Sequence, residues 1–120
     1  MPIPRLIRDR ARREIDRELT AWVRRIVEEM RPEKVILFGS AARNEAGEAS
    51  DIDMVVIAES SESFLDRVGR AIELYEGKRD VHPLVYTPAE WERMLAQERD
   101  FARTVLAEGQ VLYERGPTGP

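Results

Sequence analysis

Apolar side chains recur at every third or fourth position through the first 30 residues, with charged side chains between them. The apolar positions are Leu6, Ile7, Ile15, Leu19, Trp22, Val23, Ile26, Val27 and Met30. This spacing predicts an amphipathic helix that buries one face. Pro32 disfavours helical backbone in the residue before it, so we expect the helix to occupy residues 1–31.

Four later segments have the short apolar runs that are typical of β-strands. They are residues 34–38 ("KVILF"), 51–58 ("DIDMVVIA"), 79–86 ("RDVHPLVY") and 110–114 ("QVLYE"). Pro83 lies inside the third segment. Because proline cannot donate a ladder hydrogen bond, this segment is expected at a sheet edge or at a bulge.

Two further helices are expected between these strands. Ser60 or Ser61 can cap a helix over residues 62–76, and Gly77 can end it.

The sequence "TPAE" predicts the start of the second of these helices, with Thr87 as the cap, Pro88 in the first turn and Glu90 completing a capping box. The second helix, in one or two pieces, is expected to run to about Ala107, with Gly109 at its end.

The elements alternate between helix and strand if a short helix follows "FGS". This order predicts an α/β fold with a small mixed sheet of about four strands packed with helices. A chain of 120 residues fits one compact domain, and no internal repeat or linker divides it. We therefore expect a single domain over residues 1–115 and a loose tail over residues 116–120.

Composition narrows the range of partners. The 19 Lys and Arg residues and 23 Asp and Glu residues give a formal charge of −4, which argues against direct binding of nucleic acid. Residues 5–25 are nevertheless basic, so a local surface for anions stays open. The absence of cysteine and the single His82 exclude thiolate and histidine-rich metal sites. With no apolar run of membrane-spanning length and no signal peptide, we expect a cytoplasmic protein without a membrane partner.

Two carboxylates stand where the second strand begins. Side chains alternate along a strand, so Asp51 and Asp53 share one face and Ile52 takes the other. Two like charges at this spacing require either a proton on one of them or a cation between them. At neutral pH a divalent cation is the better solution, and carboxylate oxygens suit Mg²⁺, which takes substrate phosphates as further ligands.

A glycine–serine pair follows the preceding strand and complements these carboxylates. Gly39 permits a tight turn, and if "SAAR" opens a helix, its free N–H groups and the Ser40 hydroxyl can bind phosphate. Alone, each motif is more often a simple turn or an exposed loop edge. Together, about a dozen residues apart and each beside an apolar strand, they indicate a nucleoside triphosphate bound with Mg²⁺.

The stretch "FGSAAR…SDIDMVV" resembles the signature of the superfamily of nucleotidyltransferases that includes DNA polymerase β, and it is most similar to the minimal nucleotidyltransferases. "LVYTPAEWERML" and "EGQVLYE" resemble these proteins more loosely, so the resemblance covers most of residues 33–114. Where these proteins often have glycine, this chain has Asn44, which also tolerates left-handed backbone angles.

The resemblance implies a role for each matching residue. Asp51 and Asp53 would bind Mg²⁺, with two ions expected. The nucleotide-binding residues would be Gly39, Ser40, Arg43 and Ser50. The alternative readings are that Arg43 is an ordinary surface arginine and that Ser50 caps the start of a strand.

The resemblance also implies a third catalytic carboxylate on the neighbouring strand, which helps to deprotonate the attacking hydroxyl. Asp80 is the choice, because a carboxylate can both bind Mg²⁺ and accept a proton; a solvated charge at the strand edge is its alternative reading. If the register follows from "VYTP", however, His82 stands where many relatives carry aspartate; the reading favoured for His82 is a partly buried polar side chain.

The resemblance further implies that the chain transfers AMP from ATP to a hydroxyl group, typically of tyrosine, on a HEPN-domain protein, and is the antitoxin of that toxin. One alternative is a transferase for a small molecule, although no further substrate domain is expected. The other is a non-catalytic module that neutralises its partner by covering it. The sequence does not determine which acceptor residue is modified, which nucleobase is preferred or whether the protein forms a homo-oligomer.

Overall fold

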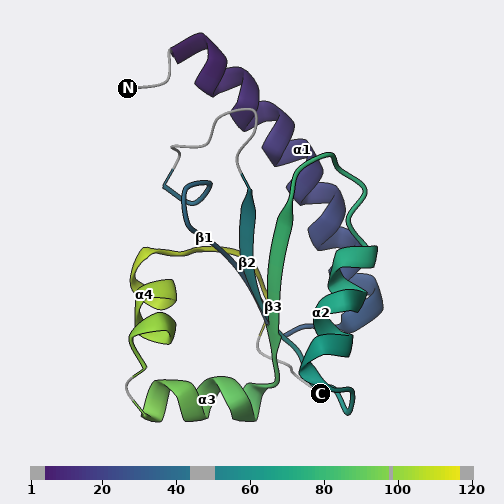
Figure 1. Cartoon of the computed structure of the whole chain (residues 1–120), viewed down its shortest axis with the longest axis vertical. Helices are drawn as coiled ribbons and strands as arrows, with labels where there is room; N and C mark the ends of the chain where they lie inside the picture. Colours follow the sequence, from purple (N-terminus) through teal and green to yellow (C-terminus); the bar gives the residue numbers. More distant parts are fainter. Residues whose placement is uncertain (1–4, 44–50, 98, 117–120) are drawn as a thin grey trace.

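We describe the protein from a computed structural model of the chain. The described residues are 5–43, 51–97 and 99–116. Within them the chain forms a mixed four-stranded sheet with helices on both faces (Figure 1), which confirms the predicted α/β class.

The sheet has the strand order β3-β2-β1-β4. Its strands are β1 (Lys34–Phe38), β2 (Ile52–Ile57), β3 (Val81–Tyr86) and β4 (Gln110–Glu114). Strand β1 pairs antiparallel with both β2 and β4, whereas β2 and β3 run parallel. β3 is an edge strand, so the prediction for Pro83 is confirmed, because an edge position needs no donor from proline on its outer side.

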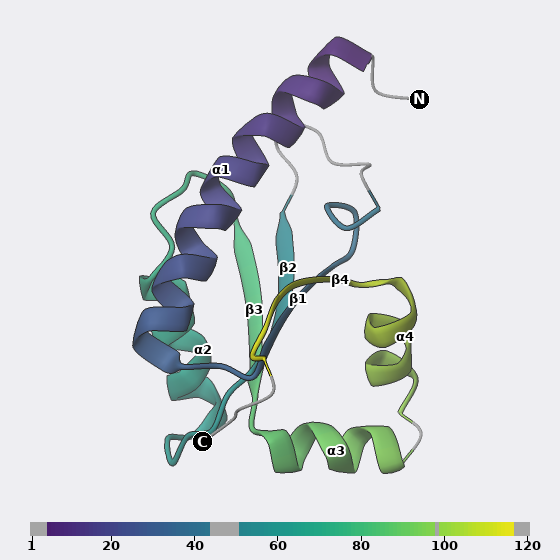
Figure 2. The same cartoon turned by 180° about the vertical axis from the view of Figure 1, so that it is seen from behind.

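The helices cover the two faces of the sheet in pairs (Figures 1 and 2). α1 (Arg5–Met30) and α2 (Phe64–Glu73) lie on one face, and α3 (Pro88–Ala96) and α4 (Asp100–Glu108) lie on the other. Side chains alternate along β2, so this strand contributes to the apolar core on each face of the sheet. Met54 is buried towards α1, and Val55 is buried towards α4. None of the helices in the described part of the chain is long and apolar enough to cross a membrane.

The apolar stripe of α1 is buried as its spacing predicts. Ile15 and Ile26 are fully buried, and Trp22 packs between α1 and α2, where its indole N–H donates to the carbonyl of Ala71 at 2.9 Å. The helix ends at Met30, and Arg31 has a positive φ of 48° before the predicted stop at Pro32.

The start of α2 differs from the prediction. Ser63, rather than Ser60 or Ser61, caps the helix, and its hydroxyl accepts the N–H of Asp66 at 3.2 Å. The hydroxyl of Ser60 instead accepts the N–H of Glu62, at 3.0 Å, in the preceding turn. A cap must directly precede the first helical residue, so the choice among three nearby serines depends on where the chain leaves the sheet. The helix also ends earlier than predicted, before Leu74 rather than at Gly77.

The predicted capping box at the start of α3 is confirmed. The N–H of Glu90 donates to the Thr87 hydroxyl at 3.2 Å, and the N–H of Thr87 donates to the Glu90 carboxylate at 2.8 Å. The helical region is in two pieces, since α3 ends at Ala96 and α4 begins at Asp100. Gly109 ends α4 as predicted, and "QVLYE" is the last strand.

A buried ion pair joins α2 to the β3–α3 junction. The guanidinium of Arg67 is 6% exposed and donates to both carboxylate oxygens of Glu90, at 2.7 and 3.1 Å, and to the carbonyl of Val85 at 2.7 Å. The hydrogen bonds from Arg67, followed by those from Thr87, lower the pKa of the Glu90 carboxyl from 4.5 to about 2. This pair therefore fixes the end of the sheet at which β2 and β3 finish.

Candidate active site

The candidate residues Gly39, Asp51, Asp53 and His82 lie at one end of the sheet, where β1 finishes and β2 and β3 begin (Figure 1). Because β1 and β2 are antiparallel, Phe38 at the end of β1 pairs with Asp53 at the start of β2. The turn that follows Phe38 therefore begins beside the two carboxylates.

The carboxylates face the side of the sheet that carries α3 and α4. Ile52 is fully buried in the core beneath α1, so Asp53 and, by alternation, Asp51 point to the opposite face. The side chain of Asp51 is about half exposed, at 51%. The two acidic groups thus share one face at an open end of the sheet, where solvent and a ligand can reach them.

Gly39 lies against a carboxylate, and this position has no room for a side chain. Its φ is +76°, and a Cβ atom at this position would lie 2.5 Å from Oδ2 of Asp53. Both observations exclude a side chain, since an L-residue disfavours this φ and would collide with the carboxylate. The absence of a side chain therefore lets Asp53 lie directly against the backbone of the turn.

The expected helix after Gly39 is only a turn in the described residues. Residues 40–43 form one helical turn, which is closed by the N–H of Arg43 donating to the carbonyl of Gly39 at 3.2 Å. The amides and the hydroxyl available to a phosphate are thus those of a single turn. The side chain of Arg43 is exposed, and the predicted residue Ser50 lies outside the described residues, as does Asn44.

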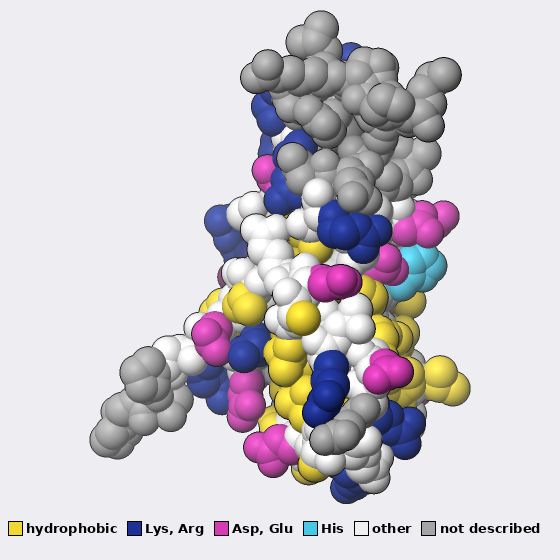
Figure 3. Space-filling view, turned by 90° about the vertical axis from the view of Figure 1, so that its left-hand side faces the viewer, with side chains coloured by type: hydrophobic (Ala, Val, Ile, Leu, Met, Phe, Trp, Pro, Cys, Tyr) yellow, Lys and Arg dark blue, Asp and Glu magenta, His cyan; other side chains and the backbone are white. Residues whose placement is uncertain are grey.

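On the neighbouring strand, His82 is the residue in register with Asp53. Its Nε2 lies 3.1 Å from Oδ2 of Asp51, a hydrogen bond between two half-exposed side chains. The space-filling view shows the cyan histidine at the surface among magenta carboxylates (Figure 3).

Asp80, the sequence-based choice, lies one residue before β3, where its carbonyl accepts the N–H of Ile52 at 3.0 Å. Among the described contacts, the structure thus joins His82 to the paired aspartates, and the signal in the sequence was the register of "VYTP".

The donor set fits a magnesium ion that shares its coordination with a substrate. Among the described residues, no group of three or more His, Cys, Asp or Glu side chains is arranged to hold a metal by itself. Mg²⁺ is commonly held in proteins by one or two carboxylates together with water and substrate phosphates. Asp51 and Asp53 provide that number of carboxylates on one face, beside a turn whose backbone Gly39 leaves uncovered.

Comparison with known proteins decides the family. The profile of the nucleotidyltransferase domain family matches residues 21–112, which include the turn, both aspartates and β3. The chain belongs to this nucleotidyltransferase family.

A Sulfolobus solfataricus protein assigned as a nucleotidyltransferase has a similar crystal structure, with a TM-score of 0.65 over 90% of this chain and 87% of that chain. The two sequences are 19% identical, so this likeness shows the fold. No curated protein matches the chain significantly.

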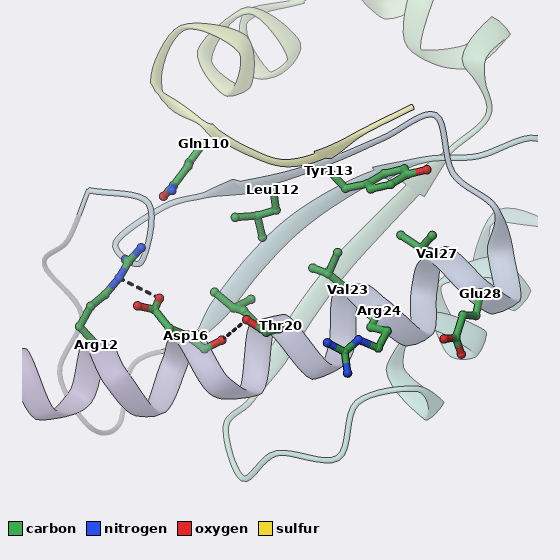
Figure 4. A pocket seen from close by; sticks show the side chains of 11 residues that line it. Arg12, Asp16, Thr20, Val23, Arg24, Val27, Glu28, Gln110, Leu112 and Tyr113 are labelled. Carbon is green, nitrogen blue, oxygen red and sulfur yellow. Dashed lines mark hydrogen bonds and ion pairs between the residues drawn. The ribbon is translucent and has the colours of Figure 1, made fainter. Parts of the chain in front are cut away.

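One contact to the turn of this nucleotidyltransferase comes from α1 and was missed by sequence reasoning. Nη1 of Arg12 donates to the carbonyl of Ala41 at 2.7 Å. Figure 4 shows the second contact of this guanidinium, in which Nε lies 3.0 Å from Oδ1 of Asp16. The sequence showed only that the first helix is basic. Which of its arginines reaches the turn depends on how α1 crosses the sheet, and this packing is not readable from helical periodicity.

A groove in the described part of the nucleotidyltransferase lies on the other side of the sheet from the carboxylates. It has a volume of about 710 Å³ and runs between α1 and β4 (Figure 4). Its apolar floor includes Leu19, Val23 and Leu112, and Arg12 lines it near the turn. This groove is therefore separate from the candidate site formed by the two carboxylates and the turn.

Proposed function

We propose that this nucleotidyltransferase transfers AMP from ATP to a hydroxyl group of a protein partner in a Mg²⁺-dependent reaction. The observation that carries the proposal is the contact between the Asp53 carboxylate and the uncovered backbone of Gly39, with Asp51 on the same face. A metal-binding group and a phosphate-binding turn are thereby adjacent, as a metal-bound triphosphate requires.

Each residue of the site has a separate task in this proposal. The amides of the turn and the hydroxyl of Ser40 bind the phosphates, while Gly39 keeps the approach open, and Arg43 and Ser50 extend the phosphate contacts. Asp51 and Asp53 hold Mg²⁺. When bound, Mg²⁺ neutralises charge on the phosphate oxygens and polarises the reacting phosphorus. The protein itself contributes position and fixed dipoles, with no covalent intermediate on the chain.

The reaction forms one bond and breaks one. The acceptor oxygen bonds to the α-phosphorus of ATP, the bond from that phosphorus to the bridging oxygen breaks, and pyrophosphate leaves. The acceptor hydroxyl gives up its proton to a base on the chain. Asp80 is the base proposed from the sequence, and the register of β3 supports His82 as a second candidate, because His82 contacts Asp51.

Two substitutions separate these candidates for the base. Asp80→Asn and His82→Ala should be compared for the rate of label transfer from ATP at equal folded concentration. Only the substitution at the working position is expected to lower the rate by about 100-fold or more, the usual contribution of a general base. If neither variant loses activity, the proton leaves by another route and both assignments are wrong.

The proposed acceptor is a HEPN-domain protein, for which this chain would be the antitoxin; the resemblance of "FGSAAR…SDIDMVV" supports this assignment. The test incubates the chain with labelled ATP, Mg²⁺ and the purified partner. We expect label on a hydroxyl side chain of the partner with wild type and at least about a thousandfold less with Asp53→Asn, because the metal and its charge neutralisation are lost. No label on the partner, with wild type and Asp53→Asn indistinguishable, would rule out the enzyme.

A non-catalytic binding module is the second candidate, and the hydrogen bond between His82 and Asp51 favours it. A histidine at this position replaces a carboxylate charge and engages one of the two metal ligands. In that case Asp53→Asn should neutralise the partner as well as wild type does, in a growth or ribonuclease assay. Loss of neutralisation in Asp53→Asn, with partner binding intact, would exclude this module.

A further inference from the structure

We propose that Arg12 is a positioning residue that holds the Gly39–Ser40 turn in the conformation that receives the phosphates of ATP. This inference rests on the proposed function, since it concerns the same phosphate-binding turn. Arg12 belongs to α1, 29 positions away from Ala41 in the sequence, whereas Asp53 belongs to β2.

The turn receives support from two directions. Ala41 is fully buried against the core beneath α1, which fixes its side chain, and its carbonyl accepts the hydrogen bond from Arg12 at 2.7 Å. The bond is partly buried and links a charged donor to a neutral acceptor, a class stronger than an ordinary backbone bond. Arg12 therefore fixes the orientation of the peptide group that follows Ala41.

That orientation matters because the two ends of a peptide group point in opposite directions. In a trans peptide the carbonyl of Ala41 and the N–H of Ala42 are antiparallel, so a carbonyl held towards α1 directs this N–H away from α1. The bond from Arg43 to the carbonyl of Gly39 fixes the N–H of Ser40 in the same way. The two bonds together set the directions of two of the amides proposed to bind phosphate.

The guanidinium is itself held in place. Its Nε pairs with Asp16 one turn further along α1, and its Nη1 reaches Ala41, so one planar group joins the helix to the turn. Its side chain is 26% exposed, in contrast with Arg10 on the same helix, which is 69% exposed and lies 3.8 Å from Glu14. A lysine has one ammonium without this fork, so it cannot reproduce both contacts in the same geometry.

The test measures binding of ATP and of inorganic tripolyphosphate to the full chain by calorimetry, with Arg12→Gln compared to the matched control Arg10→Gln. We expect the Kd of both ligands to rise roughly five- to tenfold in Arg12→Gln, the scale of one charge-assisted hydrogen bond. Arg12→Lys and Asp16→Asn should show intermediate increases. Arg10→Gln should change the Kd by less than about twofold, as is usual for an exposed ion pair.

Amide resonances of the ligand-free protein separate positioning from direct contact. If Arg12 positions the turn, the ¹H–¹⁵N signals of Ser40 and Ala42 shift in Arg12→Gln before any ligand is added, while those of α4 do not. A higher Kd without these shifts would mean that Arg12 contacts the phosphates directly, which overturns the inference. An unchanged Kd for Arg12→Gln overturns it as well.

Ligand binding by the wild-type protein tests the proposed function on which this inference rests. If wild type binds ATP and tripolyphosphate and Arg12→Gln binds them equally, only the positioning role is wrong. If wild type binds neither ligand, the proposed phosphate-binding turn and the role of Arg12 are both wrong. The melting temperature of each variant shows whether the protein is folded at the temperature of the binding measurement.

Discussion

At the end of the sheet where β2 and β3 begin, the polar groups are half-exposed and lie at the candidate site, whereas at the end where these strands finish, a buried arginine pairs with a partly exposed glutamate. Asp51 and His82 are 51% and 54% exposed at the first end. At the second end Arg67 is 6% exposed and bonds to Glu90 and to the carbonyl of Val85.

The difference follows from what each end must do. The second end joins α2, β3 and α3, and its charges satisfy one another within the protein, so removing one partner would leave the other uncompensated and destabilise the fold. At the first end, two carboxylates of like charge lie on one face beside a glycine, an arrangement that leaves room and charge for a cation and phosphates. Substitutions at the first end should therefore change function more than stability, and those at the second end should do the reverse.

In this comparison of the two ends, the largest effect on activity is expected from Gly39→Ala at the site end. The new Cβ would lie 2.5 Å from Oδ2 of Asp53 and would need a φ of +76°, so either the turn or the carboxylate must move. We expect the rate of nucleotidyl transfer to fall by at least about 100-fold, because small displacements of positioning groups have effects of this size. The free energy of unfolding should fall by only about 1–2 kcal/mol, as for an alanine at a left-handed position.

Gly69→Ala is the matched control for this substitution. Gly69 lies within α2, and nothing lies within 4 Å of the position that a Cβ would occupy. Alanine is the better helix former, so we expect the free energy of unfolding to rise by about 0.5–1 kcal/mol with unchanged transfer activity. Loss of activity in both glycine variants would show that the effect at Gly39 is not specific to the site.

The next effect is expected from Arg67→Ala at the buried end. This substitution leaves the carboxylate of Glu90 and the carbonyl of Val85 without their charged donor, and it removes the stacking of the guanidinium on Phe64, 5.8 Å from the ring centre. We expect the free energy of unfolding to fall by about 3 kcal/mol, measured by urea denaturation. ATP affinity of the folded protein should remain within about twofold of wild type, since distant sites act independently.

A loss of ATP affinity in folded Arg67→Ala would remove the distinction between the two ends. It would show that α2 and α3 also set the geometry at Asp53, through the length of β2 and β3. The measurement must therefore be made well below the melting temperature of the variant.

Much of the fold was predictable because its signals are local. The helical spacing of α1, the apolar run of β1 and the capping box at Thr87 each depend on residues within one or two turns of one another. The same is true of Asp51 and Asp53, whose common face follows from alternation alone. The match of the chain to the nucleotidyltransferase family confirms the resemblance of this stretch at the level of the family.

The details that needed the structure depend on contacts between distant segments. The choice of Ser63 over Ser60 or Ser61 as the cap of α2 depends on where the chain leaves β2. The neighbour of Asp53 on β3 depends on the parallel register, which brings His82 beside it. The contact of Arg12 with the turn depends on how α1 crosses the sheet, and nothing in the sequence distinguishes this arginine from the others of the helix.

The smallest predicted effect is the pH dependence of the pair at the buried end. The pKa of Glu90 is lowered from 4.5 to about 2 in the folded protein, chiefly by hydrogen bonds from Arg67. A carboxyl whose pKa is lower in the folded state contributes stability that is complete above about pH 4.5 and is lost as the pH falls towards 2. The side chain of Glu90 is 37% exposed, and solvent screening should limit this contribution to about 1–2 kcal/mol.

The measurement that isolates this contribution is a double-mutant cycle repeated at several pH values. The difference in the free energy of unfolding between wild type and Glu90→Gln should shrink as the pH falls from 5 to 2. In the Arg67→Ala background the same difference should show little dependence on pH, because the partner that lowers the pKa is absent. If the pH dependence persists without Arg67, the capping hydrogen bonds from Thr87, rather than the ion pair with Arg67, keep the Glu90 carboxylate ionised. The difference between the two ends of the sheet would then depend on the cap of α3.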